Sequence, residues 1–100
     1  MRNEMSFIPK LKEFLLKNKR IFTVRKYLMK EADVYISGLG YYHRKPLGIV
    51  NSISLNRYVN ESGFETVEDW VKMITHFVGI DVIWYLYEVT WVRNGEKVVY

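Results

Sequence analysis

The chain has 100 residues, of which 49% are hydrophobic and 16% aromatic, which excludes a disordered chain and fits a single domain over residues 1–100. The absence of cysteine excludes a disulfide framework, a thiolate metal site and a cysteine nucleophile. Residues 1–50 carry eleven basic and four acidic side chains, against four and seven in residues 51–100. This basic half suits a phosphate backbone or another anionic ligand, and equally a solvated helix face.

The first predicted element is a helix over residues 6–17, where apolar side chains recur at helical spacing. Ser6 can cap this helix, and Pro9 lies in its first turn, where a missing N–H is harmless. Asn18 is expected to take the left-handed conformation that ends the helix.

A strand is predicted over residues 21–27, because apolar and polar side chains alternate there. Phe22 and Val24 are expected to face the core. Thr23 and Arg25 then face the other way, where they are available to a ligand.

Two further short strands are predicted over residues 33–37 and 46–54. The core candidates of the second one are Leu47, Ile49 and Ile53. Residues 41–45 read YYHRK, which mixes aromatic and basic side chains. We interpret this segment as an exposed loop that suits stacking on bases, or as an ordinary loop with one tyrosine in the core.

A short helix is predicted over residues 55–62 and a longer one over residues 66–77. Thr66 and Asp69 occupy the two positions of a capping box for the longer helix. One apolar stripe, which would bury Trp70, consists of Val67, Trp70, Val71, Ile74 and Phe77.

The longest strand is predicted over residues 82–92, followed by an Asn-Gly hairpin turn at residues 93–96 and a last strand over residues 97–100. The segregation of strands and helices along the chain favours an α+β fold. We expect about five to six mainly antiparallel strands with two to three helices packed on them. Such a sheet tends to curl into a small β-barrel, which protects its edges.

Three segments carry a resemblance to a known family. Residues 18–25 read NKRIFTVR, residues 62–77 read SGFETVEDWVKMITHF, and residues 82–92 read VIWYLYEVTWV. This combination resembles the ASCH family (activating signal cointegrator homology) of the PUA-like superfamily. The family pattern is G-x-K-x-x-E/T-x-R at the first barrel strand, then a GF-x-S/T-x-E-E helix entry and a long x-Y-x-I-E-F strand.

In the first motif, Arg25 matches the family arginine and Thr23 matches the threonine variant of the acidic position. Arg20 stands where the family has lysine, and Asn18 stands where it has glycine. The remaining matches are Gly63, Phe64, Val67, Glu68 and Asp69 in the second motif and Glu88 in the long strand.

The resemblance implies a PUA-like β-barrel, a cleft lined by the first motif, and RNA-related binding. Some bacterial members resemble hydrolases that deacylate modified cytidine with a lysine, a threonine and a glutamate, which makes Thr23 and Glu68 the catalytic candidates here. Arg20 stays protonated and cannot act as a base, and Lys19 would point to the other face of an extended strand. This departure favours binding over hydrolysis.

Each candidate residue also has a purely structural interpretation. Arg25 suits a bidentate contact to phosphate or a base edge, but it can also pair with an acid such as Glu88 or Asp69. Thr23 can donate to a ligand or simply favour the strand. Glu68 can face the cleft, whereas Asp69 is expected to cap its helix.

Metal ions and membranes are not expected partners. His43 and His76 lie on different elements without metal-ligand spacing or a third ligand, and we expect no cofactor. No apolar run reaches the roughly 18 residues that span a bilayer, and lysines interrupt the N-terminal region where a signal peptide needs an apolar core. We therefore expect a soluble, cytoplasmic protein.

The leading hypothesis is a module that binds RNA or a nucleotide-like ligand through a basic cleft at the start of the first barrel strand. The residues expected to contact the ligand are Lys19, Arg20, Thr23, Arg25, Lys26, Tyr42, Arg44 and Lys45. One alternative is a small hydrolase acting on RNA or a modified nucleoside, similar to an N4-acetylcytidine amidohydrolase or a ribonuclease. The other is an adaptor that docks a protein partner through exposed aromatic side chains.

Overall fold

The computed structural model describes residues 3–93, so the predicted turn at 93–96 and strand at 97–100 lie outside the described residues or at their border. The elements are β1 (Glu4–Met5), α1 (Pro9–Asn18), β2 (Arg20–Arg25), β3 (Ala32–Ile36), β4 (Gly40–Val50), η1 (Ser54–Arg57), η2 (Val59–Glu61), α2 (Val67–Phe77) and β5 (Trp84–Arg93). The short segments η1 and η2 are single 3₁₀ turns, where one continuous helix was predicted.

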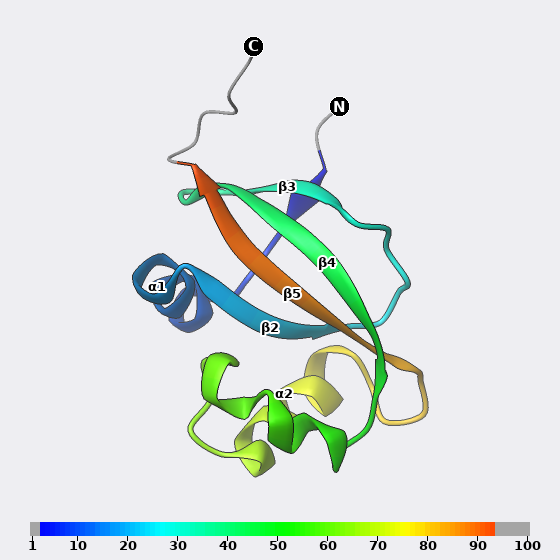
Figure 1. The fold of residues 1–100 in the computed structure, drawn as a ribbon. Coiled ribbons are helices and arrows are strands. Elements are labelled where there is room, and N and C mark those ends of the chain that lie inside the picture. The colour runs from blue at the N-terminus through cyan, green and yellow to red at the C-terminus, as the bar shows by residue number, and fades with distance from the viewer. Residues whose placement is uncertain (1–2, 94–100) are drawn as a thin grey trace.

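The five strands form one curled sheet in the order β1-β3-β4-β5-β2. The short β1 runs parallel to β3, and the other neighbours are antiparallel. Figure 1 shows α1 lying beside β2 and α2 lying below the sheet. The chain therefore has an α+β fold built on a mixed half-barrel, with two α-helices packed on it.

The helix α1 begins at Pro9 and not at Ser6 as the sequence predicted. Its N-cap residue is Ile8, which is extended and makes no side-chain capping bond. The residue before a proline is disfavoured in the helical region, because its backbone clashes with the proline ring. Helical structure therefore cannot pass back through Ile8 to Ser6.

The same helix ends one residue later than predicted. Lys19, not Asn18, takes the left-handed conformation, with φ of 65°. Asn18 remains in the last turn, where its side-chain amide donates to the Phe14 carbonyl at 2.9 Å. This turn leads directly into β2, whose first residue is Arg20.

The strand β2 is buried on both faces. Phe22 and Val24 contact the outer cluster, and this inward direction was predicted. The expectation that Thr23 points away from a core is wrong, because Thr23 shares its face with Ile21, which lies in a second cluster. The outer cluster consists of Phe22, Val24, Leu55, Phe64, Trp70, Ile74 and Leu86.

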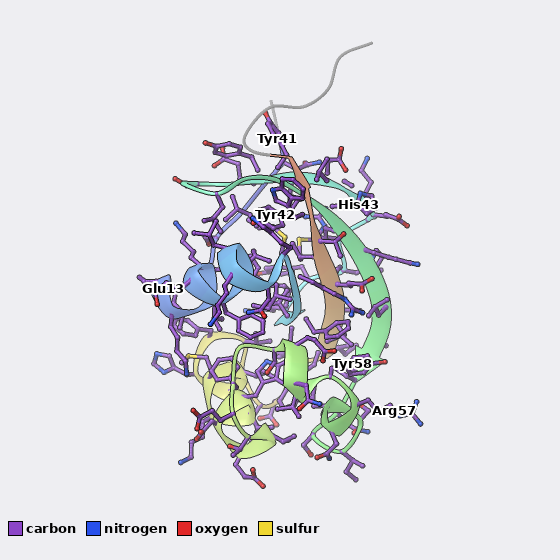
Figure 2. All side chains as sticks on the ribbon, turned by 60° about the vertical axis from the view of Figure 1, so that its left-hand side comes forward. Glu13, Tyr41, Tyr42, His43, Arg57 and Tyr58 are labelled. Atoms are coloured by element: carbon purple, nitrogen blue, oxygen red, sulfur yellow. The ribbon has the colours of Figure 1, made fainter. Side chains whose placement is uncertain are left out.

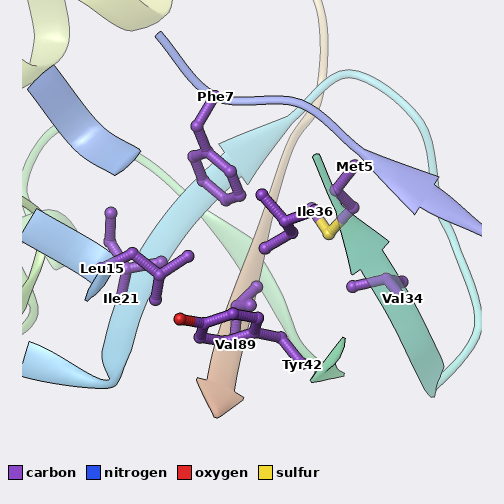
Figure 3. Packing of buried hydrophobic residues seen from close by; sticks show 8 residues of the cluster. All are labelled: Met5, Phe7, Leu15, Ile21, Val34, Ile36, Tyr42 and Val89. Atoms are coloured by element: carbon purple, nitrogen blue, oxygen red, sulfur yellow. The ribbon is translucent and has the colours of Figure 1, made fainter. Parts of the chain in front are cut away.

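The second cluster, here the inner cluster, draws on all five strands and α1, and its face of the sheet is the inner face. Its members are Met5, Phe7, Leu15, Ile21, Val34, Ile36, Tyr42 and Val89 (Figure 3). The two clusters lie on opposite sides of β2, because neighbouring residues of a strand point to opposite faces.

The strand β4 covers the segment at 41–45 that was predicted as a loop, and it ends earlier than the predicted strand at 46–54. Figure 2 shows Tyr42 and His43 on opposite sides of this strand. A bulge between Pro46 and Gly48 shifts its register. The three core candidates of the predicted strand are instead exposed, namely Leu47, Ile49 and Ile53.

The helix α2 matches its prediction closely. The Asp69 N–H donates to the Thr66 hydroxyl at 3.1 Å, which is one half of the expected capping box. Trp70 is only 3% exposed, as the apolar stripe predicted. Phe77 departs from the stripe and is 62% exposed, since the following Val78 contacts the outer cluster in its place.

Candidate anion-binding site

The inner face changes character along its length. Opposite residues of antiparallel strands lie side by side on the same face, so the register defines rows across β2, β5 and β4. From the end of β2 inward, these rows are Arg25–Tyr85–Ile49, Thr23–Tyr87–Pro46 and Ile21–Val89–Arg44. The inner cluster fills the apolar end of the face, and the polar end is formed by Thr23, Arg25, Arg44 and Tyr87.

Arg25 connects β2 to the segment that precedes α1. Its guanidinium lies over the Phe7 ring, with 4.7 Å from the guanidinium carbon to the ring centre. One Nη2 hydrogen is donated to the Ser6 carbonyl at 2.9 Å, and Nε donates to the Thr23 hydroxyl at 3.4 Å. A guanidinium carries five N–H donors, and Arg25 uses only some of them here. Both hydrogens of Nη1 have no hydrogen-bond partner among residues 3–93.

Arg44 is only 5% exposed and lies deeper in the same region. Its Nε and Nη2 donate to the Lys30 carbonyl at 3.2 and 2.9 Å, and Nη1 lies 3.6 Å from the Met29 sulfur. All of these acceptors are uncharged. The side chain thus holds the connection between β2 and β3 without neutralising its own charge.

Tyr87 on β5 forms hydrogen bonds to the connection between β2 and β3. Its hydroxyl donates to the Tyr27 carbonyl at 2.8 Å and accepts from the Met29 N–H at 2.6 Å. Its ring is fully buried. Together with Arg44 it fixes residues 27–30 across the polar end of the inner face.

The two guanidinium groups are not neutralised. In the part of the chain that the structure describes, no carboxylate forms an ion pair with Arg25 or Arg44. The pKa of Arg25 is lowered to about 10, first because burial disfavours the charged form and second because Arg44 is also positive. Buried charges of one sign are unfavourable unless a counter-charge is supplied. The polar end is therefore a place where an anion would be stabilised.

Arg20 is not part of this site. It lies on the opposite face of β2, where Nε and Nη2 both reach the same Glu88 carboxylate oxygen at 2.6 Å. Its guanidinium also covers the Phe22 ring at 4.7 Å. Glu88, one of the two acids predicted as possible partners of Arg25, thus pairs with Arg20 instead.

The other predicted ligand contacts are spread over the molecule. Lys19 lies with Nζ 5.0 Å from the Trp91 ring centre, and Lys26 lies 5.6 Å from that of Tyr27. Lys45 is exposed on the outer face, opposite Glu88. These three lysines do not form one binding surface with Arg25.

Tyr42 belongs to the inner cluster and not to an exposed loop. Its ring is fully buried, so neither ring face is open to a base in this conformation. Figure 3 shows its hydroxyl directed toward Leu15 and Ile21. Among residues 3–93 no group forms a hydrogen bond with this oxygen.

The two catalytic candidates lie on different sides of the sheet. Glu68 is exposed on α2 and lines an open groove of about 420 Å³ together with Ser52, Ile53 and Asn56. The helix α2 packs on the outer cluster, whereas Thr23 belongs to the inner face. The geometry does not bring this threonine and this carboxylate together.

His43 forms a cluster with Asp33 and Glu31 that the sequence did not predict. Its Nδ1 lies 2.8 Å from an Asp33 oxygen and its Nε2 lies 2.7 Å from a Glu31 oxygen. The hydrogen bond to Asp33, and then the one to Glu31, raises the pKa of His43 above 6.5. A hairpin centred on Gly38 places residue 33 opposite residue 43, so reading 41–45 as a strand would have found this contact.

Two further findings bear on partners. Within residues 3–93, no helix has the length and apolar character needed to cross a membrane. The same residues contain no group of three histidine, aspartate or glutamate side chains placed to hold a metal ion.

No family model, curated protein or solved structure matches this chain. The ASCH resemblance therefore stays a prediction, and the polar end of the inner face is the strongest structural guide to function.

Proposed function

We propose that this protein binds RNA or a nucleotide-like ligand, and that a phosphate group of the ligand sits against Arg25. The observation that carries this proposal is the pair of like-charged guanidinium groups at the polar end, which no carboxylate of the described residues neutralises. A PUA-like barrel of the ASCH type would place its first motif at the same arginine and threonine.

The guanidinium of Arg25 matches a phosphate group better than the point charge of a lysine would. The planar guanidinium presents parallel N–H groups that match two phosphate oxygens, and its Nη1 donors are unused within residues 3–93. The Thr23 hydroxyl accepts from Nε and keeps its own hydrogen for a phosphate oxygen. Arg44 lies behind them and adds positive potential without leaving its bonds to Lys30.

Charge around the site supports an anionic polymer as the ligand. Residues 1–50 have eleven basic and four acidic side chains, and Lys26 and Lys30 belong to the connection that follows Arg25. Such a field attracts phosphates over a distance and accelerates association. Because binding releases condensed cations, the affinity for RNA should fall steeply between low and moderate salt.

The experiment is a fluorescence anisotropy titration with a labelled single-stranded RNA of about ten nucleotides, near the site size of small single-strand binders. Arg25→Lys keeps the charge but loses the planar fork, so the affinity should fall about tenfold, which corresponds to roughly 1.4 kcal/mol. Arg57→Lys is the matched control, because Arg57 is an exposed arginine on η1 that projects away from the molecule (Figure 2). Its affinity should match that of the unmodified protein.

Two results would overturn the proposal. One is a titration without detectable binding even at low salt. The other is an equal loss of affinity in Arg25→Lys and Arg57→Lys, because binding would then depend on general charge and not on this site. Thermal melting of each variant shows whether the fold is retained, since Arg25 also bonds to the Ser6 carbonyl.

A further inference from the structure

The surface beside Arg25 is apolar, although it lies at the edge of a charged site. The row Arg25–Tyr85–Ile49 is the outermost one on the inner face, and Ile49 is 68% exposed. Tyr85 is half-buried between these two residues. In the connection that follows Arg25 directly, Tyr27 and Leu28 are also largely exposed.

Exposed apolar side chains in one row of the sheet, with more in the connection that follows, are typical of a surface that a ligand covers. Their position next to a phosphate-binding arginine selects the ligand chemistry. A nucleotide joins a phosphate to a flat, largely apolar base, and unpaired bases stack on tyrosine rings and on flat aliphatic surfaces. A duplex keeps its base faces covered and offers only its backbone to such a surface.

We infer that the ligand is single-stranded, with an unpaired base packed on Tyr85 and Ile49 while the neighbouring phosphate contacts Arg25. This inference rests on the proposed function, because it takes the phosphate site at Arg25 as given. The backbone positions of Tyr85 and Arg25 are about one strand spacing apart, since the two residues are opposite each other and neighbouring strands are roughly 5 Å apart. That distance is within the reach of one nucleotide.

The test separates the base from the phosphate. Binding of three probes is measured for each protein: a single-stranded RNA of about ten nucleotides, the same sequence closed into a duplex, and inorganic tripolyphosphate. Tyr85→Leu keeps an apolar side chain of similar size but removes the ring. It should weaken single-stranded RNA binding about tenfold and leave tripolyphosphate binding unchanged.

Phe77→Leu is the control for the loss of an aromatic ring elsewhere on the surface, because Phe77 is 62% exposed and lies in the last turn of α2. It should leave all three affinities unchanged. The unmodified protein should prefer the single strand over the duplex by at least about tenfold. Ile49→Thr, which preserves strand propensity, provides a second variant if Tyr85→Leu lowers the melting temperature.

The outcomes distinguish the two proposals. If single strand and duplex bind equally, or if neither Tyr85→Leu nor Ile49→Thr weakens single-stranded RNA, the base-stacking inference is wrong while the phosphate site stands. If Arg25→Lys changes neither tripolyphosphate nor RNA binding, the proposed function itself is wrong. If Tyr85→Leu changes the oligomeric state of the protein and not its RNA affinity, the apolar surface belongs to a protein interface and the inference is overturned.

Discussion

The two ends of the inner face both contain buried side chains but are chemically opposite. At the apolar end, Leu15, Val34 and Val89 are completely buried and belong to the inner cluster. At the polar end, Thr23 and Arg44 are nearly as well covered, yet one of them carries a full charge. Burying an apolar side chain stabilises the fold by about 1.5–3 kcal/mol, whereas burying an unpaired charge opposes folding.

The two ends therefore differ in their effect on the stability of the fold. Burial of apolar side chains at one end stabilises the fold, whereas the two like-charged guanidinium groups at the other end destabilise it. A sequence retains an unfavourable arrangement of this kind where a ligand relieves it. Substitutions at the two ends should therefore differ in their effect on stability and on binding.

The largest loss of stability is expected at the apolar end. Leu15→Ala removes a fully buried side chain and leaves a cavity, so the free energy of unfolding should fall by roughly 3 kcal/mol. Leu16→Ala is the control on the same helix, because Leu16 is 52% exposed, and its effect should stay under about 0.5 kcal/mol. Urea unfolding of both variants measures the difference; equal losses would show that α1 presents a different face to the sheet.

A smaller loss is expected from Arg44→Met, although this side chain is larger and just as inaccessible. The substitution leaves the Lys30 carbonyl without its two donors, but it also removes a buried charge that repels Arg25. The two effects oppose each other, so the net loss should be about 1–2 kcal/mol in the same urea experiment. A loss as large as that of Leu15→Ala would mean that Arg44 is chiefly structural.

Tyr42→Phe should have the opposite sign. The buried Tyr42 hydroxyl forms no hydrogen bond within residues 3–93, and burial raises the pKa of this phenol. Removing the hydroxyl relieves its desolvation, so the variant should be more stable by about 1 kcal/mol. A variant that is clearly less stable would reveal a bound water or another partner at this oxygen.

The smallest effect concerns His43 on the outer face. Because its folded-state pKa is raised above 6.5, its contribution to stability is complete below the unfolded pKa and is lost as the pH rises through the folded pKa. Solvent screens these contacts, so the loss between about pH 6 and about pH 9 should be near 0.5 kcal/mol. His43→Gln should lack this part of the pH dependence; an unchanged profile would show that the contacts to Asp33 and Glu31 do not contribute.

The sequence predicted those elements whose patterns follow common rules. The helix α2 has a capping threonine and an apolar stripe, and both are present in the structure. The strand at the end of the described chain and the α+β class were also predicted correctly, since aromatic and β-branched residues dominate residues 84–93. The expectation that this strand is the longest is wrong, because β4 has 11 residues and β5 has 10. The start of α1 was wrong because the restriction that Pro9 places on Ile8 was not weighed against the capping preference of Ser6.

The polar end could be predicted only in part. Thr23 and Arg25 were proposed together, and the structure does place them together through a shared hydrogen bond. The strand β4 was missed because its alternation puts Arg44 inside, whereas sequence rules place charged side chains outside. The residue that breaks the rule is thus one that marks the candidate site. The contacts of Tyr87 with residues 27 and 29 depend on the tertiary fold and have no sequence signal.

The claim that the polar end is held ready for an anion can be tested at Arg25 itself. NMR resolves the Nε–H group of each arginine, and the Arg25 signal is assigned by its loss in Arg25→Lys. During titration with a short single-stranded RNA, this signal should shift in a saturable manner, while those of Arg20, which is paired with Glu88, and of Arg57 should stay in place. An Arg25 signal that does not move while the lysines of α1 respond to the RNA would contradict the account.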